Sequence, residues 1–322
     1  MRVVAFGGGH GLAASLRALR RCAAHLDLDI TAVVTVADDG GSSGRLRAER
    51  AALPPGDLRQ ALVALAGDDP VTQRSAELFH YRFVANGHGG PDKDPLAGHA
   101  VGNLVLLGLF ELLDDPVAAL DHAAAMLGAA GRVLPMSCEP LCIEADVRGA
   151  EPDRPDEVVV VRGQHAVAVT AGRVESVRLT PSAPKACAEA LAAISEADWL
   201  IFGPGSWYTS VIPHLLVPEL AEAIVASPAR RLVTLNLATE RETSGLSIAD
   251  HLAALRRYLP DLTVDVVLGD RVAVGDPEPV VQAAESLGAR LVLARVAAAD
   301  GSPRHDSVAL GAALLPVLGS GR

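Results

Sequence analysis

The chain has 322 residues, half of them hydrophobic and only 3% aromatic, and a formal net charge of −11. This length suits one large α/β domain or two smaller ones with a core of Ala, Val and Leu. The acidic balance argues against a nucleic-acid partner, because contacts to phosphates require a basic surface. The most apolar stretch, residues 101–113, is shorter than the roughly 20 residues of a membrane span and contains Asn103 and Glu111. We therefore expect a buried helix there and no membrane span.

Two features of the sequence predict a cytoplasmic protein. The four cysteines form no CxxC pair, which favours free thiols in a reducing compartment over structural zinc. Residues 2–6 have the pattern of a strand, without the charged, apolar and cleavage regions of a signal peptide.

The first predicted strand, residues 3–6, leads into a glycine-rich turn and then a helical pattern. Such a turn points free backbone N–H groups and the positive end of the helix dipole at a ligand, which suits a phosphate. Tight packing of the strand against the helix would also require glycines and is the alternative explanation of this turn. His10 within the turn either contacts a phosphate or is merely exposed. As a dinucleotide-binding GxGxxG motif the turn has Leu12 in place of the third glycine, which weakens the interpretation as a nicotinamide dehydrogenase. The candidate ligand-binding residues here are Gly7, Gly8, Gly9, His10 and Gly11.

A second strand, predicted over residues 30–36, is followed by a loop that combines carboxylates, glycines, hydroxyls and an arginine. Glycines admit backbone N–H groups close to an anion, arginine holds a phosphate through two hydrogen bonds, and aspartates bind a metal or ribose hydroxyls. A tight surface turn would explain the glycines and one aspartate but not the continuation into Arg45 and Arg47. We therefore predict a phosphorylated or nucleotide ligand. The candidate residues are Asp38, Asp39, Gly40, Gly41, Ser42, Ser43 and Arg45.

A helical insertion is predicted over residues 57–130, with a Gly/Pro/Asp-rich loop at 86–98 that covers or flanks the site. Asp57 suits a helix N-cap, which alone would explain it, and the Arg59 guanidinium in the same turn is harder to explain; both Asp57 and Arg59 are candidate ligand-binding residues. His99 and Asn103 share one face of a helix, so they form either a ligand-facing pair or a satisfied core pair.

The rest of the chain predicts a β-rich insertion and the second half of a sheet. The insertion covers residues 134–180, with a hairpin made by 167–170 and 174–177. Alternation of further strands with helices indicates an α/β fold: a Rossmann-like, mostly parallel sheet with helices on both faces, in a single domain over 1–322. These strands are expected at 199–202, 232–235, 264–268 and 291–295. A second glycine turn supplies the candidate ligand-binding residues Gly203, Gly205, Ser206, Tyr208 and Thr209.

Eight motifs, in this order along nearly the whole chain, resemble the YvcK-like family of bacterial gluconeogenesis factors, which is related to CofD. They are GGGHGL (7–12), ADDGGSSGRLR (37–47), PPGDLR (54–59), YRF (81–83), GHAVGNL (98–104), VLP (133–135), GPGSWYTS (203–210) and ADH (249–251). The chain departs from the family pattern where His10 replaces the Thr of GGGTG. It also has Glu240 for a Gln and Arg241 for the Gly before Glu-Thr, while Asn236, Glu242 and Thr243 match.

The resemblance implies a Rossmann-like fold and a cytoplasmic protein needed for normal cell shape and growth on gluconeogenic carbon sources. The family is associated with UDP-sugars, notably UDP-N-acetylglucosamine. CofD proteins instead transfer a phospholactyl-type group from a nucleotide-activated donor to a deazaflavin, with a divalent metal held by the Asp-Asp loop. The resemblance therefore implies Asp38 and Asp39 as metal or ribose ligands. It further implies Asn236 as a ligand-binding position and Arg304 as a diphosphate or sugar contact.

Two classes of function follow from these observations. A non-catalytic UDP-sugar sensor, with protein partners in cell-envelope regulation, is favoured because an arginine- and glycine-rich anion site comes without an evident nucleophile or base dyad. The alternative is a CofD-type transferase in which Mg²⁺ on Asp38 and Asp39 neutralises a leaving diphosphate. Mg²⁺ is thus expected only for the transferase. The oligomeric state is not fixed by these patterns, and the exposed Ala/Leu helices are compatible with a homodimer.

Overall fold

A computed structural model describes residues 1–85, 94–151 and 153–320. Its centre is a seven-stranded sheet in the order β10-β9-β8-β7-β1-β2-β3, in which every neighbouring pair is parallel. The strands are short runs of Val, Ile, Leu and Ala because helices cover both faces of a parallel sheet. This confirms the predicted fold class. The strands are β1 (Arg2–Gly7), β2 (Asp29–Val34), β3 (Arg132–Pro135), β7 (Trp199–Phe202), β8 (Arg230–Thr234), β9 (Val266–Asp270) and β10 (Arg290–Ala294).

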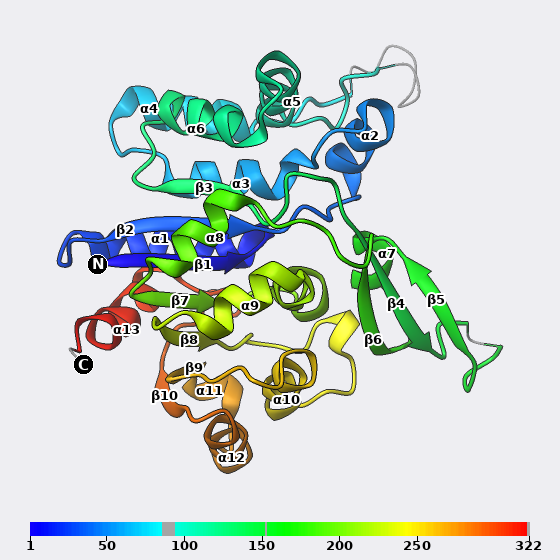
Figure 1. Cartoon of the computed structure of the whole chain (residues 1–322), viewed down its shortest axis with the longest axis vertical. Coiled ribbons are helices and arrows are strands. Elements are labelled where there is room, and N and C mark those ends of the chain that lie inside the picture. The colour runs from blue at the N-terminus through cyan, green and yellow to red at the C-terminus, as the bar shows by residue number, and fades with distance from the viewer. Residues whose placement is uncertain (86–93, 152, 321–322) are drawn as a thin grey trace.

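The winding of the chain places helices on both faces of this sheet. From β1 the chain moves outward through β2 to β3, and from β7 it moves the opposite way to β10. Because such crossovers are right-handed, the two directions put their helices on opposite faces. On one face α1 (Gly9–Ala23) packs against α3 (Pro55–Leu65) and α13 (Ser307–Gly319), whereas α8 (Ala188–Ser195) and α9 (Pro218–Ala226) pack together on the other (Figure 1). The strand order reverses between β1 and β7, which is where open α/β sheets bind ligands.

Aromatic packing joins the two central strands. The rings of Phe6 and Phe202 stack with their centroids 4.8 Å apart, and the edge of His214 meets Phe6 at 5.5 Å. His214 is fully buried, and burial lowers its pKa to about 4, so the ring is neutral at pH 7. The centre of the sheet is therefore rigid beneath the loops that follow β1 and β7. The remaining helical segments of this half are η2 (Trp207–Val211), η3 (Ile212–Leu216), η4 (Arg241–Thr243), α10 (Ile248–Tyr258), α11 (Arg271–Val274) and α12 (Glu278–Ser286).

The segment predicted to be helical supplies α3, α4 (Pro70–His80), α5 (Val101–Leu113) and α6 (Pro116–Met126). Asp69 caps α4 by accepting hydrogen bonds from two backbone N–H groups, and Pro70 occupies the first helical position, where its missing N–H costs nothing. Of the predicted loop over 86–98, residues 86–93 lie outside the described residues.

Two expectations for this region need correction. The helix α5 has the predicted bounds but is only partly buried, because Asn103 and Leu106 face inward while Leu112 is 77% exposed. The predicted binding loop also contains an unexpected helix, α2 (Gly41–Arg50). Ser42, Ser43 and Arg45 therefore belong to a helix. The sequence Gly-Ser-Ser-Gly does not predict this helix, because glycine and serine have a low preference for helices.

The β-rich insertion is a three-stranded antiparallel sheet in the order β5-β4-β6. The predicted hairpin is wrong: residues 167 and 168 end the helix α7 (Gln164–Ala168), and β6 (Arg173–Thr180) pairs with β4 (Cys142–Arg148) rather than with its immediate neighbour. The Val-rich sequence favours a strand, but packing overrides this preference by burying Val167 in the core. The edge strand β5 (Val158–Arg162) lies on the other side of β4.

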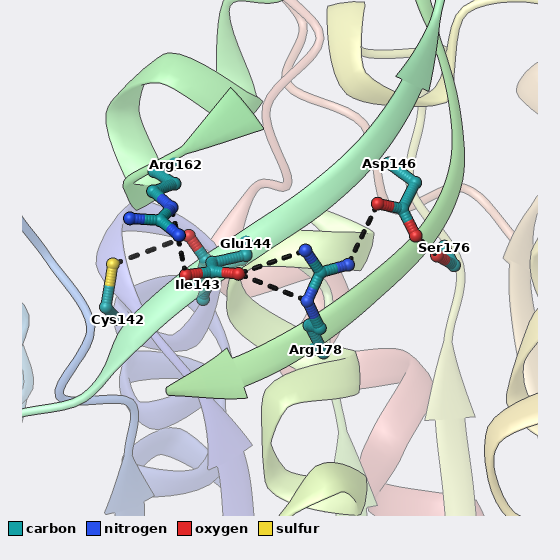
Figure 2. Close-up of polar contacts among 7 residues, drawn as sticks. All are labelled: Cys142, Ile143, Glu144, Asp146, Arg162, Ser176 and Arg178. Carbon is teal, nitrogen blue, oxygen red and sulfur yellow. Dashed lines mark hydrogen bonds and ion pairs between the residues drawn. The ribbon is translucent and has the colours of Figure 1, made fainter. Parts of the chain in front are cut away.

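Charged side chains on one face of this small sheet form ion pairs between neighbouring strands (Figure 2). Glu144 on β4 forms ion pairs with Arg162 on β5 at 3.2 Å and with Arg178 on β6 at 3.0 Å. Arg178 also contacts Asp146 at 2.9 Å, and Ser176 donates a hydrogen bond to Asp146 at 2.7 Å. A slip of one residue would move these charges to the apolar face, so the pairs specify the strand register.

Among the described residues, no single helix is long and apolar enough to cross a bilayer. One pair, Trp207–Leu216 and Pro218–Ala226, meets the length and composition test only when taken together, and it is bent by 80°.

The contact between α1 and the loop after β7 leaves no room for a side chain at Gly11. A Cβ there would overlap the carbonyl oxygen of Pro204 and lie 2.7 Å from Gly205 Cα. We expect Gly11→Ala to lower the free energy of unfolding by about 1–3 kcal/mol. Gly108→Ala is the control, because no atom lies within 4 Å of its Cβ and alanine should add up to about 1 kcal/mol in a helix. Urea denaturation measures both, and equal effects would contradict the close contact.

Candidate functional site

A pocket of about 890 Å³ lies at the reversal point of the sheet, over the loops that follow β1 and β7. Other walls are formed by the loop after β8, by α7 and by residues 303–307 before α13. Segments distant in the sequence thus meet at one place. The predicted site residues that line the pocket are Gly8, Gly9, His10, Gly11, Asp38, Asp57, Gly205, Ser206, Thr209, Asn236 and Arg304.

The two glycine turns are held in fixed positions by close contacts. A Cβ on Gly8 would lie 2.5 Å from the Asp57 carboxylate. Gly205 N donates to Asn236 Oδ1 at 3.0 Å, and Asn236 Nδ2 donates back to Gly205 O at 2.9 Å. The amide of Asn236 therefore fixes the second turn against the loop after β8.

Asp57 belongs to α3, and its carboxylate lies at the start of α1. It is buried, accepts a hydrogen bond from the backbone of Gly9, the first residue of that helix, and interacts with the charge of Asp38. Burial and the Asp38 charge raise the pKa of Asp57 to about 7. A phosphate placed at this helix end would meet a negative charge above that pH. Protonation of Asp57, or a cation between the two carboxylates, would remove this repulsion.

Positive and neutral nitrogen groups also line the pocket. Arg17 and Arg304 supply charge, and burial together with these arginines lowers the pKa of His10, which favours its neutral form. The guanidinium of Arg304 contacts Asp300 at 3.0 Å and is 71% exposed. Burial lowers the pKa of His305 to about 4, and its Nε2 has no hydrogen-bond partner within the described part of the chain. That neutral nitrogen can accept a hydrogen bond from a ligand hydroxyl.

Several predicted residues lie beneath the pocket in a buried hydrogen-bond network. Arg59 Nε donates to Asn103 Oδ1 at 2.8 Å, and Asn103 Nδ2 donates to Ser42 Oγ at 3.0 Å. Ser42 Oγ also lies 3.0 Å from His99 Nδ1. His99 and Asn103 are thus satisfied partners of this network, the second of the two arrangements that their spacing allowed.

The remaining predicted residues lie outside the pocket lining. Asp39 accepts a hydrogen bond from His165 N at 2.8 Å and so fixes the start of α7. Arg45 Nη2 donates to Ala97 O at 2.8 Å. The two aspartates of the loop are therefore directed to different places: Asp38 lines the pocket, whereas Asp39 contacts α7. The other residues outside the lining are Gly7, Gly40, Gly41, Ser43, Gly203 and Tyr208.

Sequence reasoning missed part of the lining. Arg17 follows His10 by seven residues, two helical turns, so helical spacing could have placed it on the same face. No local signal marks Gln164 and His165, because α7 reaches the pocket only through the folding of the insertion. The other missed residues are Ala14, Gln60, Ala168, Pro204, Ser210, Leu237, Ala238, Thr239, Glu240, Ala298, Pro303, His305, Asp306 and Ser307.

The fold and the site together define a doubly wound α/β protein with a glycine-lined pocket at its reversal point. A family model described as 2-phospho-L-lactate transferase CofD matches residues 3–292, and the chain belongs to this family. It is 49% identical to the "Putative gluconeogenesis factor" of Mycobacterium tuberculosis, over 97% of this chain and 89% of that protein. It is 35% identical to the "Gluconeogenesis factor" of Listeria monocytogenes, over 98% of this chain and 95% of that protein.

A solved structure agrees with this assignment. A crystal structure of a Bacillus halodurans protein, 32% identical, superposes with a TM-score of 0.83 over 98% of both chains. The resemblance drawn from the eight motifs is thereby confirmed.

The raised pKa of Asp57 has a consequence for stability. Because the folded state binds this proton more tightly than the unfolded state, its contribution to stability is present at low pH and is lost as pH rises from about 4 to about 7. Asp57→Asn removes this loss. We expect the variant to gain on the order of 2–4 kcal/mol relative to the native chain between pH 4 and pH 8.

Denaturation at several pH values measures this difference. Asp69→Asn is the control: hydrogen bonds lower the pKa of the Asp69 carboxylate, so its effect on stability changes with pH only below about pH 4, and the difference from the native chain should stay nearly constant between pH 4 and pH 8. A difference between Asp57→Asn and the native chain that stays constant from pH 4 to pH 8 would contradict a raised pKa.

Proposed function

We propose that this chain is a gluconeogenesis factor that binds a UDP-sugar, UDP-N-acetylglucosamine, in the 890 Å³ pocket and acts as a regulatory protein rather than as an enzyme. In this proposal it works in the cytoplasm and is required for normal cell shape and for growth on gluconeogenic carbon sources. The names of relatives with 35–49% identity over nearly the full chain support this role.

The observation that carries the proposal is the convergence of glycine turns, arginines and a free ring nitrogen on one pocket. The guanidinium of Arg304 and the hydroxyl group of Ser206, which both line the pocket, suit a diphosphate. The unpartnered Nε2 of His305 suits a sugar hydroxyl. A volume of about 890 Å³ lies within the range of sites for ligands of this size.

A regulatory role fits the way that the pocket is assembled. Its walls come from the central sheet, from α7 in the β-rich insertion and from the segment before α13. A ligand that contacts all three favours the arrangement in which they are close, and a protein partner in cell-envelope regulation could distinguish that arrangement. Among the described residues, neither Ser206 Oγ nor Ser210 Oγ hydrogen bonds with a histidine or a carboxylate, so neither hydroxyl is activated as a nucleophile.

Calorimetry tests the ligand. We expect UDP-N-acetylglucosamine to bind more tightly than GTP or NAD, and Arg304→Gln to weaken it about tenfold through loss of a charged hydrogen bond worth about 1.5 kcal/mol. Arg290→Gln is the matched control, because Arg290 is exposed on β10 away from the pocket. Failure of UDP-sugars to bind at millimolar concentration would refute the proposal.

Two carboxylates that line the pocket, Asp38 and Asp57, favour a second candidate function, a CofD-type transferase that acts on a nucleotide-activated phospholactyl-like donor. Mg²⁺ typically binds one or two carboxylates together with phosphates of a substrate, and a cation would also offset the repulsion by which the Asp38 charge raises the pKa of Asp57. Asp38 and Asp57 would hold the ion. Its charge would stabilise the negative charge that develops on a leaving phosphate. Asp39, engaged at the start of α7, would act only indirectly.

Product analysis separates the two functions. After incubation with nucleotide and Mg²⁺, a binding protein returns its ligand intact, whereas a transferase consumes it. If the transferase is correct, Asp57→Asn should lower Mg²⁺-dependent turnover at least 100-fold, since it removes a ligand of the metal. Chromatography of the same samples used for calorimetry measures both outcomes. Recovery of intact nucleotide from the native chain would exclude the transferase for the donors tested.

A further inference from the structure

We propose that a second groove, outside the pocket, binds the phosphate group of an organic phosphate monoester. This arginine groove has a volume of about 770 Å³ and lies between α1, α3 and α4. Its charged lining residues are Arg17, Arg20 and Arg21 from α1 together with Asp68 and Glu77. The lining is therefore locally positive in a chain whose formal net charge is −11.

The arginines of the groove lack strong partners. Arg17 and Arg21 make no side-chain hydrogen bond or ion pair within the described part of the chain. Partial burial and the neighbouring Arg20 lower the pKa of Arg17, the direction expected for a cation without a counter-charge. Arg20 pairs with Asp68 at 2.7 Å, but the Asp68 side chain is 88% exposed, and such pairs contribute little. A phosphate monoester, with a charge of about −1.5 to −2 at pH 7, would compensate the charges of Arg17 and Arg21.

A neutral N–H donor completes the polar part of the groove. Arg59 Nη1 lies 2.7 Å from His80 Nδ1. A guanidinium can only donate, so Nδ1 accepts and the neutral ring carries its proton on Nε2. Burial and the Arg59 charge both lower the pKa of His80, which keeps the ring in this form. His80 lines the groove and so adds an N–H donor to the arginines.

The floor of the groove determines which kind of phosphate fits. Val63, Ala64 and Ala76 provide apolar surface beside the arginines, and the ring of Tyr81 is 52% exposed at the edge. An inorganic phosphate would use only the charges. A phosphate monoester with an aromatic or alkyl group would also bury apolar surface, so the groove favours the ester.

The experiment compares phenyl phosphate with inorganic phosphate on the full-length chain by calorimetry at low ionic strength. Phenyl phosphate is expected to bind at least fivefold more tightly than inorganic phosphate. The double variant Arg20→Gln/Arg21→Gln should weaken phenyl phosphate at least tenfold. The single variant Arg21→Gln, at an exposed position whose side chain forms no hydrogen bond or ion pair with another described residue, should weaken it at least threefold. Arg74→Gln, on α4 but outside the groove, should change the affinity less than twofold.

Two results would overturn the proposal. The first is that both groove variants bind phenyl phosphate as tightly as the native chain. The second is that Arg304→Gln loses this binding while the groove variants keep it, since the phosphate would then lie only in the pocket. Equal affinity for the two probes would refute the preference for an ester. Neither Arg20 nor Arg21 lines the pocket, so binding of UDP-N-acetylglucosamine should be unchanged in these variants. The groove and the proposed UDP-sugar site can thus fail independently.

Discussion

The contact of Gly11 with the backbone of Pro204 and Gly205 is the constraint on which the site depends. It brings the start of α1 against the loop after β7, at the place where the strand order reverses. Asn236 then fixes Gly205 from a third loop through two hydrogen bonds. Because these contacts involve main-chain atoms, the turns are held in position before any ligand arrives, which reduces the entropy that binding would cost.

Groups of both charges line the pocket. Asp57, whose pKa is raised by the charge of Asp38, lies at the start of α1, where a helix dipole alone would attract an anion. Arg17, which is also on α1, and Arg304 supply positive charge. The glycine turn after β1 is therefore not a simple phosphate site. Its affinity for an anion depends on the proton, or the cation, at Asp57.

The two insertions serve the site in different ways. The helical insertion supplies Asn103 and His99, which support Ser42 and Arg59 from below. The β-rich insertion supplies a wall, because Asp39 fixes the start of α7 and the ion pairs around Glu144 maintain the register of the sheet that carries it. The loop after β2 thus connects the central sheet to α7, which packs into the core through Val167.

The sequence alone determined six of the seven parallel strands, the two glycine turns and the family, because these depend on local runs of apolar residues and on short motifs. It did not predict β3, which is a short strand at the edge of the sheet. It could not determine that Asp38 and Asp39 are directed to different places, that residues 164–168 form a helix, or that Arg17 is shared by the pocket and the groove. Each of these depends on which distant segment packs against the residue. Asp57 shows the reason most clearly. Its place in the sequence predicts a helix cap and a candidate ligand contact, but not that burial and the charge of Asp38 raise its pKa to about 7, because only the tertiary structure brings those groups together.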